Sequence, residues 1–85
     1  MRDKEKEVKD LINELNEETK RMRKEVTDKV NEDESLGIIG KMSKAYEMLE
    51  TRYRCIREIQ NLLRDNGWDI KMNMQNYELS YYGRI

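Results

Sequence analysis

Residues 38–63 decide the fold, and they read IIGKMSKAYEMLETRYRCIREIQNLL. Apolar side chains recur at alternating steps of three and four, which is the spacing of one helix face. A second apolar row lies beside the first, and together they span roughly 160° of the helix surface. Because a two-stranded coiled coil buries a narrower stripe, we expect this helix to contact at least two neighbours. The first row is Ile39, Met42, Tyr46, Leu49, Tyr53, Ile56, the polar Gln60 and Leu63, and the second is Ile38, Ala45, Met48, Cys55, Ile59 and Leu62.

A narrower apolar seam precedes this stretch and predicts another helix over about residues 3–31. Thr19 is the one polar residue within the seam. It is either a tolerated polar layer or a device that fixes register or oligomeric state. The seam consists of Val8, Ile12, Leu15, Thr19, Met22 and Val26.

The segment between the two seams predicts a short connection at residues 32–37, which makes the helices antiparallel neighbours. It is acidic and ends in glycine, and Asp33 or Ser35 is expected to cap the second helix. Asn66 followed by glycine is a helix-stop signal, so the second helix is expected to span about residues 38–66.

After residue 67 the apolar period changes from 3.6 to two, which predicts a β-hairpin over about residues 68–82. A two-residue turn at Gln75-Asn76 would pair Met74 with Tyr77 and make one face of the hairpin apolar. The same register pairs Met72 with Leu79 and Ile70 with Tyr81. A two-stranded hairpin is marginal alone, so this face must lie on the helices or on another chain.

The length and composition of the chain favour a single mainly α domain over residues 1–85 that self-associates. The chain is 36% hydrophobic and 41% charged, so it has little material for an independent core. We therefore expect a long antiparallel helical hairpin with a short C-terminal β-hairpin, assembled into a dimer or higher oligomer.

Composition also argues against several classes of function. The 17 basic and 18 acidic residues give a net charge of −1, which removes the simplest case for nonspecific nucleic-acid binding. With no histidine and one cysteine, neither a zinc site nor a Ser-His or Cys-His dyad is expected, and we predict no enzyme activity and no cofactor. Cys55 lies in the apolar arc and is expected to be buried. The charged N-terminus and the lack of a 20-residue apolar run predict a cytoplasmic protein, of the producing or host cell, without membrane contact.

Two groups of basic residues are candidate binding sites. The first group lies on the first helix and has two interpretations. It is either a contact site for an anion or an acidic protein, or a solvated helix face with (i, i+4) partners. In the second group, Arg54 and Arg57 lie on the polar face, whereas Arg52 falls inside the apolar arc and needs a carboxylate, an anionic ligand or a route to water. The first group is Lys20, Arg21, Arg23 and Lys24.

The C-terminal segment is rich in aromatic residues, which are favoured at interfaces and are equally ordinary in hairpin packing. Tyr82 points away from the apolar face in the predicted register, so it is the strongest candidate for an exposed contact. The group is Trp68, Tyr77, Tyr81 and Tyr82.

These features favour a non-enzymatic interaction module, a small oligomeric adaptor or inhibitor that binds a partner protein. The small, charged, proline-free composition is also typical of phage or mobile-element products, which suggests a host or defence protein as the target. One alternative is nucleic-acid or nucleotide binding through the basic groups. The other is a purely structural assembly unit.

Overall fold

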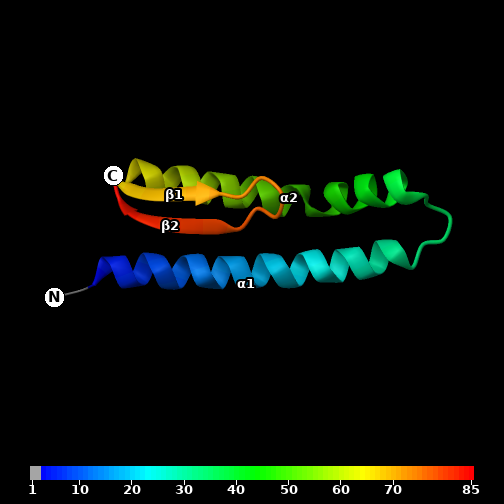
Figure 1. The fold of residues 1–85 in the computed structure, drawn as a ribbon, viewed down its shortest axis with the longest axis horizontal. Helices are drawn as coiled ribbons and strands as arrows, with labels where there is room; N and C mark the ends of the chain where they lie inside the picture. The colour runs from blue at the N-terminus through cyan, green and yellow to red at the C-terminus, as the bar shows by residue number, and fades with distance from the viewer. Residues whose placement is uncertain (1–2) are drawn as a thin grey trace.

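The computed structural model describes residues 3–85 and shows two long antiparallel helices with a two-stranded antiparallel sheet beside them (Figure 1). Helix α1 spans Lys4–Asn31 and helix α2 spans Ile38–Asp65. Strand β1 spans Trp68–Met72 and strand β2 spans Leu79–Arg84. The predicted helical hairpin followed by a β-hairpin is confirmed. The molecule is elongated, with extents of 55 × 18 × 17 Å.

The two helices begin differently. Asp3 caps α1, because its carboxylate accepts a hydrogen bond from the Lys6 backbone N–H at 3.2 Å. The N-cap of α2 is Gly37, which supplies no side-chain bond, so the predicted cap by Asp33 or Ser35 is wrong. The Asp33 carboxylate is instead used within the connection, where it accepts bonds from the Ser35 hydroxyl and backbone N–H. These bonds lower the pKa of Asp33 below its ordinary value of 3.8.

The end of α2 agrees with the predicted stop signal. Asn66 is the C-cap, and Gly67 follows with φ of 91°, in the left-handed region that glycine occupies without steric cost. The chain reverses there and enters β1 at the next residue.

The predicted register of the sheet is confirmed for two of the three predicted apolar pairs. Ile70 pairs with Tyr81, and Met72 pairs with Leu79. A bulge between Trp68 and Ile70 shifts the pairing near the chain end. One face of the sheet therefore carries the apolar residues, and this face lies on the helices.

The predicted two-residue turn is wrong, because the strands are joined by a longer connection over residues 73–78. Asn73 organises this connection: its side chain accepts a bond from the Gln75 backbone N–H at 2.8 Å, and its carbonyl accepts one from the Tyr77 N–H at 2.7 Å. Two-residue turns need positive φ at glycine-like positions, which Gln-Asn does not supply. Tyr77 itself takes φ of 59°, and Met74 is exposed instead of paired with it.

The core forms two clusters where the hairpin meets the helices. The larger combines Val8 and Ile12 of α1 and Ile56 of α2 with residues of both strands. The smaller joins Leu49 and Tyr53 to Tyr77, and the rings of the last two stack at 3.8 Å between centroids. The second neighbour that the wide apolar arc demanded is thus the hairpin of the same chain, but the hairpin lies along only half of the helical pair (Figure 1).

Candidate interaction surface

Thr19 of the first seam and Arg52 of the apolar arc meet inside the molecule. Arg52, whose side chain is 13% exposed, donates from Nε to Thr19 Oγ1 at 3.2 Å and from Nη2 to the Leu15 carbonyl at 3.1 Å. Thr19 is fully buried and donates its hydroxyl to the same carbonyl at 2.7 Å. Glu18 lies 3.8 Å from the guanidinium. Arg52, a candidate partner contact in the sequence, is therefore engaged within its own chain.

Two amide side chains fix the hairpin on the helices. Asn16 of α1 donates to the Leu79 carbonyl at 2.9 Å and accepts from the Leu79 N–H at 2.8 Å. Gln60 of α2 donates to the Ile70 carbonyl at 3.1 Å. The role of Asn16 was missed, because it lies beside the seam and nothing in the pattern distinguishes it from other solvated amides. Gln60 carried a signal, since it interrupts an apolar row.

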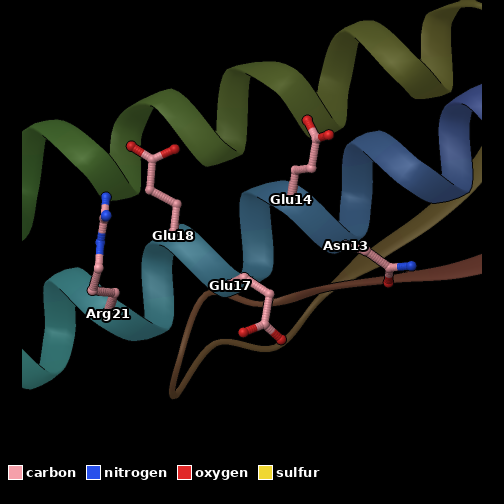
Figure 2. A pocket seen from close by; sticks show the side chains of 5 residues that line it. All are labelled: Asn13, Glu14, Glu17, Glu18 and Arg21. Atoms are coloured by element: carbon pink, nitrogen blue, oxygen red, sulfur yellow. The ribbon is translucent and has the colours of Figure 1, made fainter.

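The four basic residues of α1 do not form one patch. Lys20 lies 3.6 Å from Glu78, and Lys24 is exposed. Arg23 is half-buried and faces the groove described below. Arg21 borders a shallow hollow on α1 whose remaining lining residues are Asn13, Glu14, Glu17 and Glu18 (Figure 2). No group of three or more His, Cys, Asp or Glu residues within residues 3–85 is arranged to hold a metal ion.

The other arginine candidates remain on the solvated face of α2. Arg54 lies 3.1 Å from Glu50, one helical turn away, and both side chains are at least half exposed. Arg57 is exposed as well. An exposed (i, i+4) pair contributes little to stability, so these residues are free to contact a partner without loss of the fold.

The aromatic candidates divide between core and surface. Trp68 and Tyr77 are largely buried, because each packs in a core cluster, and their role as contact residues stays a prediction. Tyr81 is half-buried near Lys9, and desolvation together with a hydrogen bond to a neighbouring glutamate raises its pKa. Tyr82 is exposed, as the register predicted.

The first turns of α2 expose the seam that the helix buries from Leu49 to Ile56. Ile56 is 0% exposed, whereas Ile39 is 82% exposed. Ile39, Met42 and Tyr46 were predicted to lie in a core or an oligomer seam, and they are outside the chain's own core, because the hairpin reaches Tyr53 and ends before the first turns of α2. Their role in an oligomer seam stays a prediction.

The second apolar row of α2 is also largely exposed. Met48, Cys55 and Leu62 face away from the hairpin, so the expected burial of Cys55 is wrong. Leu62 is 61% exposed, although it lies in the half of α2 that the hairpin covers. The hairpin therefore covers only one side of the predicted arc.

A groove runs between the open halves of the helices. Next to the connection between β1 and β2 it forms a hollow of about 360 Å³. It continues toward the connection between α1 and α2 as a second hollow of about 160 Å³. Tyr46 and Tyr53 contact each other in it, with ring centroids 5.9 Å apart. The apolar side chains that line the two hollows are Met42, Ala45, Tyr46, Leu49, Tyr53, Met74, Tyr77 and Val30.

Comparisons with known proteins give no relative from which a role can be transferred. No protein-family model matches the chain, and neither the curated proteins nor the solved structures contain a significant match. Within residues 3–85, neither helix has the length and apolar character needed to cross a bilayer. The groove between the open halves of the helices is therefore the feature that bears on function.

Proposed function

We propose that this protein is a non-enzymatic interaction module, a small adaptor or inhibitor that binds a partner protein through the open groove between α1 and α2. The observation that carries the proposal is the exposure of Ile39, Met42 and Tyr46 on the face that the hairpin buries further along α2. Contiguous exposed apolar side chains on a small protein mark an interaction surface.

The composition of the groove supports the proposal. Methionine and aromatic side chains are enriched at protein interfaces, and both types line this groove. Tyr53 and Tyr77 at its floor are buried in a core cluster, and their rings are already stacked in the free protein. In its most concrete form, the module is a phage or mobile-element product that acts on a host or defence protein in the cytoplasm.

The alternatives have weaker support. Nucleic-acid or nucleotide binding needs clustered free cations, whereas Lys20 pairs with Glu78 and Arg52 bonds within the chain. A structural assembly unit would use the same exposed face for a second copy. The two possibilities differ in the mass of the purified protein, because an assembly unit would form an oligomer without a partner.

The test compares two single-residue changes on α2. Met42→Glu places a charge in the groove, and Leu62→Glu places the same charge on an equally exposed apolar residue outside it. We expect wild-type protein and Leu62→Glu to capture the same protein from the lysate of the producing or host cell, and Met42→Glu to lose it. Helical circular dichroism checks both folds. Equal capture by both variants would refute the groove as the binding surface.

A further inference from the structure

The groove differs in its charged lining residues from three other hollows of the molecule. The hollows along α1 and near the helical connection each include at least one acidic residue, such as Glu17, Glu25 or Asp33. No Asp or Glu lines either hollow of the groove in the described chain, and its two charged residues are Arg23 and Lys41. The charged residues that line the groove are thus both cationic, although the chain has more acidic than basic residues.

Arg23 is the more informative of the two cations. It is half-buried beside the apolar lining, and it forms no hydrogen bond or ion pair with any residue in the described range 3–85. Arg52, the other partly buried arginine of the helical pair, has three partners. A guanidinium beside apolar surface gains most from a carboxylate, because charge-assisted bonds are stronger in a less polar environment.

The shape of the groove fits a helix. It lies between two antiparallel helices and is closed at one end by Met74 and Gln75 of the hairpin connection. Its α2 wall runs from Lys41 to Tyr53, which is about 18 Å at 1.5 Å per residue. An amphipathic helix of about three turns would add a third helix to the pair and cover the exposed seam with its apolar face.

We infer that the groove binds an acidic amphipathic helix of a partner protein, with apolar residues directed at Met42 and Tyr46 and a carboxylate directed at Arg23. This inference rests on the proposed function and specifies the chemistry of the partner. A second copy of the chain fits less well, because a two-fold contact through one patch brings the same groove from both copies together. The Arg23 and Lys41 pairs would then meet like charges.

The experiment uses the full chain and three labelled 14-residue peptides as probes. The first has leucines at helical i, i+3, i+4 and i+7 spacing with glutamates elsewhere. The second replaces each glutamate with lysine, and the third scrambles the acidic sequence. Fluorescence anisotropy measures the dissociation constant of each peptide. We expect the acidic helix to bind at least tenfold more tightly than either of the others.

Three variants test the residues that carry the inference. Arg23→Glu should weaken the acidic peptide at least tenfold and favour the basic one, and Arg23→Gln should give an intermediate loss. Arg21→Glu, a charge reversal two residues away on α1 and outside the groove, is the matched control and should change the affinity less than threefold. Helical circular dichroism confirms that each variant is folded.

The contrary results separate this inference from the proposed function. If the acidic peptide does not bind, or if Arg23→Glu leaves its affinity unchanged, the acidic helix is refuted. The proposed function still stands in that case if cellular capture depends on Met42. A dimer in light scattering that becomes a monomer in Met42→Glu would assign the groove to a second copy and overturn the inference.

Discussion

The two halves of the helical pair carry the same kind of apolar seam and have opposite surroundings. In one half, Ile56 and its neighbours lie beneath the hairpin and are buried. In the other half, Ile39 and Met42 continue the seam of α2 into solvent. The apolar pattern of a helix shows which side chains can be buried. The length of the element that packs against the helix decides which of them are buried.

The difference has a physical origin in the hairpin. The strands contain five and six residues, and a strand advances about 3.3 Å per residue, whereas α2 has 28 residues at 1.5 Å each. The strands therefore extend over less than half of α2, and the connection between them extends the cover only as far as Tyr53 and Leu49. Apolar side chains beyond the end of the hairpin are exposed to water unless another molecule binds over them.

The largest expected effect comes from one substitution made in both halves. Ile56→Ala should lower the free energy of unfolding by about 2–5 kcal/mol, because it leaves a cavity in the core. Ile39→Ala should change it by less than about 0.5 kcal/mol, because the side chain is exposed. Urea denaturation followed by circular dichroism measures both. Similar losses would show that Ile39 is covered in solution.

The buried polar layer between the halves should give the next largest effect. Thr19→Val removes the acceptor of Arg52 Nε and should cost about 1–3 kcal/mol, because a nearly buried donor is left without a partner. Adding Arg52→Met should cost less than the sum of the single changes, since both partners are then removed. The same denaturation experiment completes this double-mutant cycle. Additive losses would mean that the two side chains are not coupled.

Two glycines should respond in opposite directions. Gly67→Ala should destabilise the covered half by about 1–2 kcal/mol, because alanine is strained at its left-handed φ of 91°. Gly40→Ala should stabilise the open half by up to about 1 kcal/mol, because glycine is a poor helix former and a Cβ there meets only the Leu36 side chain at 3.5 Å. Thermal melts distinguish the two signs. A loss of stability in Gly40→Ala would indicate a closer neighbour at that position.

The smallest effect concerns Asp33 in the connection at the open end. Hydrogen bonds from Ser35 lower its folded-state pKa below 3.8, so its contribution to stability is present above pH 3.8 and is lost as the pH falls through the lowered pKa. Ser35→Ala removes the hydroxyl bond and should shift the pKa of Asp33 back toward 3.8. Carboxyl-carbon NMR titration measures both values. Titration of Asp33 at or above 3.8 in the wild type would contradict the hydrogen-bonded connection.

Much of the fold could be predicted because local signals agree with it. The seams located both helices, Asn66-Gly67 located the end of α2, and the two-residue period gave the register of the sheet. The turn failed because the side chain of Asn73 stabilises a longer connection than the strand pattern suggests. The candidate site was anticipated only in part: Arg23 was among the basic candidates, but its position in an acid-free groove depends on three separate segments.

The sequence by itself determined the helices, the strands and which faces of them are apolar, because these depend on residues a few positions apart. The tertiary structure alone decided which apolar residues are covered, that Arg52 bonds to Thr19, and that Asn16 holds β2. Those outcomes depend on where a short hairpin comes to lie on two long helices. That placement is a balance of packing and hydrogen bonds between segments up to 63 residues apart, which no local pattern encodes.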